Sequence, residues 1–122
     1  RIPLYCTAIG KMLLSDMDTE EMHARIEAIR MVPFTPYTIR NAQDLEKELE
    51  RIRNEGYAED AEEHEEGIHC IAAPIRDSSE RIVAALSVSW PKFRFETEKK
   101  NSYCDRIRQA AEEISAILGS KA

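Results

Sequence analysis

Cysteine is scarce in this sequence, and the few cysteines follow no pattern. The three, Cys6, Cys70 and Cys104, lie far apart and show no Cys-x-x-Cys spacing. This argues against a disulfide-rich secreted domain and against the common zinc motifs. Scattered thiols in odd number are typical of a reducing compartment, so we expect a cytoplasmic protein.

Long apolar runs are also lacking. No stretch approaches the roughly 20 apolar residues that a membrane-spanning helix requires, and the N-terminal Arg1-Ile2-Pro3 resembles neither a signal peptide nor a transit peptide. The sequence does not begin with methionine, and a helix is predicted almost at once. We therefore expect these 122 residues to form one domain of a longer protein.

Basic residues are fewer than acidic ones. The chain has 17 Lys and Arg against 23 Asp and Glu, a net charge of −6, and a pI near 5.1. Affinity for nucleic acid requires a basic face. We therefore expect that this chain does not bind DNA by itself.

The most informative segments that are present are two apolar runs, Ile68–Ile75 and Ile82–Ser89. The linker Asp77-Ser78-Ser79-Glu80 between them is typical of a turn, so the runs are predicted to form a β-hairpin. Pairing outward from this turn sets Arg76 against Arg81.

Alternation of side chains along a strand divides the hairpin into two faces. One is apolar and is predicted to be core: Ile71, Ala73, Ile75, Ile82, Ala84, Leu86 and Val88. The other is small and partly polar: Ile68, Cys70, Ala72, Pro74, Val83, Ala85, Ser87 and Ser89. In this register Cys70 lies opposite Ser87, and Ile68 opposite Ser89. We interpret the second face as the floor of a small-molecule pocket, because it is poorly suited to helix packing.

Apolar residues at helical spacing predict four helices, over residues 7–17, 18–29, 41–55 and 96–118. Asp18, three residues before a glutamate, is predicted to cap the second helix, and Asn41 or Asp44 to start the third. Gly56 and Gly119 follow the third and fourth helices, where glycine commonly ends a helix. The predicted inner face of the last helix is Ile107, Ala110, Ala111, Ile114, Ile117 and Leu118.

An acidic segment from Tyr57 to about His64 is predicted to be a third strand. The predicted fold class is α+β, an antiparallel sheet with helices packed on one side of it. Because three strands make a thin sheet, we expect further strands upstream of Arg1.

The acidic segment contains one candidate site residue. A three-residue loop at positions 64–66 would place Asp60 opposite Cys70, on the pocket face, whereas a four-residue loop would not. We prefer the shorter loop, although the sequence alone leaves both open. The rest of the run from Glu59 to Glu63 is expected to face solvent on an edge strand, where charge deters aggregation.

Catalysis is not indicated. His69 is adjacent to Cys70 and points to the opposite face of a strand, so the two cannot form a nucleophile–base pair. His64 is within reach from the neighbouring strand, but no glycine-rich elbow or oxyanion loop accompanies it. We expect no catalytic residue.

A metal site is not indicated either. His64, His69 and the nearby glutamates supply suitable ligand types; these glutamates are Glu62, Glu63, Glu65 and Glu66. None of the spacings is diagnostic. We expect the glutamates to form a solvated turn and His69 to lie at the surface, with no metal and no cofactor.

The start of the first predicted helix, Thr7-Ala8-Ile9-Gly10, is a candidate anion site. Backbone N–H groups in a first helical turn have no partner within the helix and bind anions well. Ala8 and Gly10 are small, so a carboxylate has room to approach. The alternative is a plain core helix.

Together these residues resemble the effector-binding domain of the IclR family of bacterial transcription regulators. The matching stretches follow the family's order along nearly the whole chain: Pro3–Lys11, Phe34–Ile39, Ile52–Tyr57, Asp60–Glu63, Gly67–Ile75, Ala84–Ser89 and Ala110–Ser115. The resemblance implies a GAF/profilin-like antiparallel sheet whose first helix and strands lie upstream of Arg1. It also implies a winged helix-turn-helix DNA-binding domain before that, absent from this chain.

The resemblance also implies site residues and a mode of action. The effector contacts would be the backbone N–H groups of Ala8 and Ile9 and the side chains of Asp60, Cys70, Ser87 and Ser89. Family members are dimers or tetramers that repress or activate catabolic operons in response to small metabolites. Trp90 departs from the family, since many members have glycine there. Trp90 with Phe93-Arg94-Phe95 is most similar to the subgroup that senses 2-keto-3-deoxygluconate, and packing of Trp90 at a subunit interface is the alternative.

We therefore expect residues 1–122 to be a ligand-sensing domain that binds a small carboxylate, such as a 2-keto acid or a sugar acid. Its expected partners are that metabolite, further copies of the chain, and operator DNA through the absent domain, with no membrane. The alternatives are an oligomerisation domain without a ligand and a thiol or zinc enzyme.

The charge balance yields a direct test. The 122-residue chain should not bind duplex DNA, because it is acidic and has no predicted helix-turn-helix. A gel-shift titration with duplex DNA at low salt checks this, and salt-sensitive binding at micromolar concentration would contradict it.

Overall fold

The computed structural model describes residues 3–121 and contains seven main elements. In chain order these are α1 (Ala8–Ser15), α2 (Thr19–Ala28), α3 (Ala42–Glu55), β1 (Ala58–Ala61), β2 (Ile68–Arg76), β3 (Ile82–Pro91) and α4 (Lys100–Ile117), with short 3-10 turns at Lys92–Arg94 and Thr97–Lys99. The strands form one antiparallel sheet in the order β1-β2-β3. The predicted α+β class with an antiparallel sheet is confirmed. Arg1 and Ile2 lie outside the described residues.

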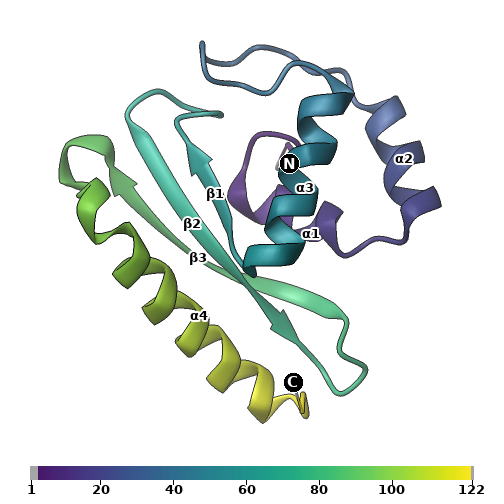
Figure 1. Ribbon diagram of the computed structural model, residues 1–122, viewed down its shortest axis with the longest axis vertical. Helices are drawn as coiled ribbons and strands as arrows, with labels where there is room; N and C mark the ends of the chain where they lie inside the picture. Colours follow the sequence, from purple (N-terminus) through teal and green to yellow (C-terminus); the bar gives the residue numbers. More distant parts are fainter. Residues whose placement is uncertain (1–2, 122) are drawn as a thin grey trace.

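Helices cover both faces of the sheet, not one. Helix α4 lies along one face, α1 packs on the other, and α3 packs on α1, with α2 outside them (Figure 1). The expectation of a one-sided arrangement is wrong because the small residues Ala58 and Ala72 let α1 approach the second face closely. Both residues are fully buried in the core beneath α1.

The hairpin register differs by two residues from the predicted one. The connection between the strands is one residue longer than predicted, because Arg76 pairs with Ile82 and Arg81 joins the turn. Glu80 within this turn has a left-handed φ of 63°. A second irregularity between Ile75 and Arg76 follows, so that Ile75 pairs with Ala84. A shift of two residues preserves the faces, since side chains alternate with a period of two.

One residue changes face in this register. Ile82 was predicted to lie on the core face with Ile71 and Leu86, but it packs against the cluster under α1. Ile71 and Leu86 pack with α4 as predicted. The irregularity between the two strands explains the exchange, because an unpaired residue reverses the alternation beyond it.

The predicted helix boundaries at the caps are confirmed. Thr7, Asp18 and Asn41 each accept a hydrogen bond from the backbone N–H three residues later. Gly56 ends α3 with a φ of 78°, a left-handed conformation that glycine adopts without steric cost.

Helix α4 begins later than predicted and buries a different face. Two 3-10 turns precede it, so it starts at Lys100 and not at Glu96. Ile107 and Ala111 are buried as predicted, together with Cys104 and Ser115. The predicted members Ile114, Ile117 and Leu118 are exposed. The apolar stripe is therefore wider than the part of the helix that contacts the sheet.

Trp90 packs within this chain. Its ring lies 4.7 Å from that of Tyr103 and 5.2 Å from that of Phe95, measured between centroids. His69, the partner of Trp90 in the sheet, stacks on Phe95 at 3.7 Å. This aromatic cluster fixes the chain reversal between β3 and α4.

Strand β2 extends beyond β1, so its last residues lack a strand neighbour on that side. Pro74 has no N–H group, and the N–H of Arg76 donates to Ser115 Oγ at 2.9 Å. Asp77 forms an isolated bridge with Gly119. This part of the sheet edge is therefore closed by proline, a side chain and the end of α4.

Within residues 3–121, no helix combines the length and the apolarity needed to cross a bilayer.

The core under α3 yields a stability prediction. Leu49 is completely buried, so Leu49→Ala should lower the free energy of unfolding by about 2–5 kcal/mol. Ile117 is 84% exposed, and Ile117→Ala should change it by less than about 0.5 kcal/mol. Urea denaturation followed by circular dichroism checks both. Equal effects of the two changes would contradict the core described here.

Candidate functional site

The predicted site residues come together at one cavity of about 270 Å³. It lies between the N-terminal end of α1, the turn after β1 and the neighbouring face of β2 and β3. Its lining is Pro3, Thr7, Ala8, Ile9, Asp60, His64, Glu65, Ile68, Cys70, Ser87 and Ser89. All six residues singled out from the sequence are in this lining, although they come from four separate segments of the chain.

Helix α1 contributes backbone donors to one wall of the cavity. Its hydrogen-bond ladder starts with Lys11 N–H donating to the Thr7 carbonyl, and the N–H of Gly10 donates to Thr7 Oγ1 at 3.0 Å. The N–H groups of Ala8 and Ile9 come before the ladder and have no carbonyl within the helix to bond. They give this wall a local positive potential.

Gly10 has a packing role, not a ligand-facing one. A Cβ at this position would lie 2.6 Å from Leu4 Cα and from the Pro3 carbonyl oxygen. The segment before α1 therefore crosses the helix in direct contact with Gly10. The expectation that Gly10 makes room for a carboxylate is wrong, since Gly10 is not in the cavity lining.

The floor of the cavity is formed by β2 and β3. Cys70 pairs with Ser89, and Ala72 with Ser87, so the predicted pairs of Cys70 with Ser87 and Ile68 with Ser89 are wrong. Cys70 Sγ and Ser89 Oγ are 3.1 Å apart and share a hydrogen bond. Ile68 pairs with Pro91. Because the register shift is two residues, both serines stay on the cavity face.

Asp60 forms the wall opposite α1. It pairs with Cys70, as the shorter of the two loop alternatives predicted. It is 5% exposed, and its Oδ1 accepts the N–H of Glu63 at 2.7 Å. Burial raises the pKa of the Asp60 carboxyl above its ordinary value, although the Glu63 N–H and the charge of Lys11 act to lower it.

A strained turn holds Asp60 in place. Strand β1 ends at Ala61, earlier than the predicted end near His64, because Glu62 adopts a left-handed φ of 59°. Such a conformation costs a residue other than glycine roughly 1–2 kcal/mol. Thr35 and Thr38 stabilise the turn by donating to the Glu62 and Glu63 carbonyls at 2.6 and 2.5 Å.

Three lining residues at the mouth had another expected role or none. His64 was considered as a catalytic base and a metal ligand, Glu65 only as a metal ligand, and Pro3 was not expected to line the site. His64 packs edge-on against Phe34, with ring centroids 5.1 Å apart. The sequence contains no local signal for this contact, because Phe34 belongs to a proline-containing loop distant in sequence.

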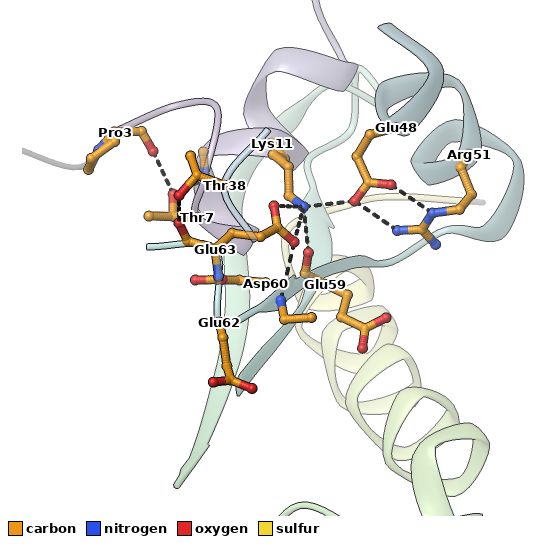
Figure 2. Close-up of polar contacts among 12 residues, drawn as sticks. Pro3, Thr7, Lys11, Thr38, Glu48, Arg51, Glu59, Asp60, Glu62 and Glu63 are labelled. Atoms are coloured by element: carbon orange, nitrogen blue, oxygen red, sulfur yellow. Dashed lines mark hydrogen bonds and ion pairs between the residues drawn. The ribbon is translucent and has the colours of Figure 1, made fainter. Parts of the chain in front are cut away.

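Lys11 is the main residue next to the site that the sequence did not single out. Its side chain is completely buried, and its ammonium lies 2.7 Å from Glu48, 2.9 Å from Glu63 and 2.5 Å from the Glu59 carbonyl oxygen (Figure 2). One signal was available: Lys11 is the only charged residue in the segment Ala8–Ser15. A lone charge on a short apolar helix needs a buried partner.

The acidic run is mostly buried and paired, so its predicted solvent-facing role is wrong. Glu63 is buried against Lys11, and Glu62 pairs with Lys92. Burial alone would raise the pKa of Glu59, but hydrogen bonds from His69 and Lys100 outweigh it and lower this pKa to about 2.

The candidate metal ligands have other partners. His69, expected at the surface, is on the central strand and lies 2.5 Å from Glu59. Glu62 and Glu63 have the lysine partners given above. In the part of the chain that the structure describes, no three His, Cys, Asp or Glu side chains converge on a point that would hold a metal ion.

A second, larger groove of about 520 Å³ lies beside α4 and the end of β2. Its two arginines already have partners. Arg108 donates to the Glu55 carbonyl at 2.8 Å and to Asp105 at 2.9 Å, and Arg76 donates to the Glu80 carbonyl at 2.8 Å. The cavity at α1 is therefore the better candidate, because its lining includes Ala8 and Ile9, whose N–H groups have no partner within the helix.

The cavity electrostatics predict the reactivity of Cys70. Burial raises the pKa of the Cys70 thiol, the bond with Ser89 lowers it, and the charges of Asp60 and Glu65 raise it further. Asp60→Asn removes one of these charges, so it should lower the pKa and speed alkylation of Cys70 by iodoacetamide near pH 8. Peptide mapping by mass spectrometry measures the rate. Glu65→Gln is the matched control with a smaller expected effect, and an unchanged rate in Asp60→Asn would contradict this electrostatic account.

Comparison with known proteins identifies the family. The family described as "Bacterial transcriptional regulator IclR C-terminal" matches residues 1–116. The HTH-type transcriptional regulator KdgR of Escherichia coli (strain K12) is 41% identical over 119 residues, which are 98% of this chain and 45% of KdgR. The chain thus spans less than half of this relative, which is a regulator and not an enzyme.

Solved structures agree with this match. The C-terminal domain of E. coli KdgR has a TM-score of 0.90 at 41% identity, covering 98% of this chain and 73% of that one. Thermotoga maritima IclR has a TM-score of 0.90 at 42% identity over 97% and 48% of the two chains. A double mutant of the PobR inducer-binding domain from Acinetobacter, in complex with 3-hydroxybenzoic acid, has a TM-score of 0.88 at 30% identity over 94% and 66%. The chain belongs to the IclR family of bacterial transcriptional regulators, and its fold is that of their C-terminal domain.

Proposed function

We propose that the cavity at α1 is an effector site for a small carboxylate that also carries keto or hydroxyl groups, such as a 2-keto acid or a sugar acid. The observation that carries this proposal is the convergence of six residues on one cavity: Ala8, Ile9, Asp60, Cys70, Ser87 and Ser89. They present backbone donors on one side and hydroxyl, thiol and carboxylate groups on the other.

The charges in the cavity set the orientation of the ligand. A ligand carboxylate binds at the α1 end, where the N–H groups of Ala8 and Ile9 have no partner within the helix. The wall formed by Asp60 repels a second carboxylate and accepts hydrogen bonds from ligand hydroxyls instead. Ser87 and Ser89 donate to keto or hydroxyl oxygens on the floor.

The size of the cavity favours a small ligand. At about 270 Å³ it lies just below the range of about 300–1,000 Å³ that is usual for drug-sized molecules. The structure of PobR with 3-hydroxybenzoic acid, a compact hydroxy-carboxylate, supports the same ligand class. The resemblance of Trp90 and Phe93-Arg94-Phe95 to the subgroup that senses 2-keto-3-deoxygluconate makes this 2-keto acid the first compound to test.

The wider role follows from the family. We infer that the complete protein is cytoplasmic and carries a winged helix-turn-helix domain that binds an operator, and that it forms dimers or tetramers. Effector binding would shift the equilibrium between subunit arrangements and so change operator affinity. Couplings of this kind typically amount to about 1–3 kcal/mol.

Calorimetric titration tests the effector site. The chain should bind 2-keto-3-deoxygluconate or 3-hydroxybenzoate, and each ligand should raise its melting temperature. Ser87→Ala and Ser89→Ala should each weaken binding about two- to tenfold, the value of one neutral hydrogen bond, with less than about 1 kcal/mol change in stability.

Ser102→Ala is the matched control, since Ser102 is exposed on α4 and is not in the cavity lining. It should leave affinity unchanged. Wild-type affinity in both serine variants would show that Ser87 and Ser89 do not contact the ligand. Failure of a panel of keto acids and sugar acids to bind would refute the ligand class.

A further inference from the structure

We propose that Lys11 is a positioning residue of this cavity: its buried ammonium fixes the separation between the α1 wall and the Asp60 wall. Lys11 is outside the cavity lining, so it acts through other groups and does not touch a ligand. The part of this inference that concerns ligand affinity rests on the proposed effector site.

The ammonium has a partner for each of its three N–H donors. Nζ lies 2.7 Å from Glu48 Oε2, 2.5 Å from the Glu59 carbonyl oxygen, and 2.9 and 3.1 Å from the two carboxylate oxygens of Glu63. Figure 2 shows these contacts radiating from one point. Lys11 therefore joins α1, α3, β1 and the turn after β1 through a single atom.

Two of these contacts flank Asp60. Glu59 is the residue before Asp60, and its carbonyl is held by Lys11. Glu63, whose carboxylate is held by the same ammonium, donates its backbone N–H to Asp60 Oδ1 at 2.7 Å. The Glu63 carboxylate also accepts the N–H of Ala61 at 3.2 Å. The backbone on both sides of Asp60 is thus attached to Lys11.

The α1 wall of the cavity is connected to Lys11 through the helix itself. Ala8 and Ile9 line the cavity and precede Lys11 by less than one helical turn. The third partner, Glu48, is fixed in turn by Arg51, whose Nε and Nη2 donate to it at 2.9 and 3.1 Å. Lys11 therefore cannot move relative to α3 without breaking its hydrogen bond to Glu48, which Arg51 holds in place.

The cost of burying charge argues for a positional role. A buried ion pair is weak evidence for stability, because desolvation offsets much of the attraction, and an apolar side chain of similar volume is often as stabilising. Hydrogen bonds with fixed directions supply what an apolar contact does not, namely a defined distance between two elements. The left-handed Glu62 lies in the same turn, between two residues that Lys11 contacts, Glu59 and Glu63.

Lys11 also affects the charge state of Asp60. The charged and titratable groups around Asp60 are Lys11 on α1, Glu63 and His64 in the turn, Cys6 before α1 and Cys70 on β2. Lys11 lowers the pKa values of Asp60 and Glu63, against the effect of burial. Its removal should raise the pKa of Asp60.

The first experiment needs no ligand. In wild type, the backbone amide proton of residue 63 should resonate at low field and exchange slowly, because it donates to a buried carboxylate. Lys11→Met should shift this resonance upfield, speed its exchange, and raise the titration midpoint of the Asp60 carboxyl carbon. Lys47→Met, an equal charge change at an exposed position of α3, should change none of these. Unchanged signals in Lys11→Met would overturn the proposal.

A charge-balanced variant separates position from charge. Lys11→Met/Glu63→Gln removes one charge of each sign and serves also if Lys11→Met alone fails to fold. This double variant lacks the hydrogen bonds of the Lys11 ammonium, so the amide signal of residue 63 should still differ from that of wild type. A wild-type amide signal in the double variant would show that Lys11 only neutralises Glu63, and would overturn the positioning role.

The ligand experiment uses 2-keto-3-deoxygluconate and 3-hydroxybenzoate. Affinity should fall at least about tenfold in both Lys11 variants and stay unchanged in Lys47→Met, and Lys11→Arg should recover part of the loss by restoring the charge and the donors. Unchanged affinity in folded Lys11 variants would overturn the proposal. If wild type binds neither compound, the ligand class fails, while the amide measurements still decide the role of Lys11.

Discussion

The close approach of α1 to the sheet is the constraint on which the rest of this structure depends. Alanines at positions 58 and 72 leave room for the helix, and Gly10 lets the preceding segment cross it in contact with its backbone. The N-terminal end of α1 then faces the surface of β2 and β3, and the space between them is the cavity. The same approach removes Lys11 from water, so the ion-pair network follows from the packing of α1. A larger residue at position 10, 58 or 72 would push α1 away from its neighbours. This would both change the cavity and expose the Lys11 ion pairs to water.

Local patterns predicted most of the fold because they depend on neighbouring residues. The caps at Thr7, Asp18 and Asn41 and the end of α3 at Gly56 follow from hydrogen bonds and backbone conformations within a few residues. The division of the hairpin into two faces was predicted, with Ile82 as the exception, because the two irregularities near the turn add up to two residues. A single irregularity would have exchanged the faces. The prediction that Ala84 and Val88 are buried was wrong, since both are exposed. The exact register depended on the left-handed conformation of Glu80, which no local rule requires.

The candidate site was predictable in its list of residues and only partly in its geometry. The sequence placed Cys70, Ser87 and Ser89 on one face, and it left the pairing of Asp60 open between two loop lengths. What it could not show were contacts between distant segments, such as those that join Lys11 to Glu48 and Glu63. For the same reason the acidic run looked solvent-exposed, since its cationic partners lie on α1, on α4 and after β3.

The ion-pair network and the unpaired end of β2 have a joint consequence for assembly. Along β1, the outward carbonyl of Glu59 is taken by Lys11 and the N–H of Ala61 by Glu63. Farther along, Pro74 lacks a donor and Arg76 is bonded to Ser115. A strand edge without available backbone groups cannot recruit another chain, which is how natural sheets avoid edge-to-edge aggregation. The edge of the sheet formed by β1 and the end of β2 therefore offers few backbone groups to an added strand.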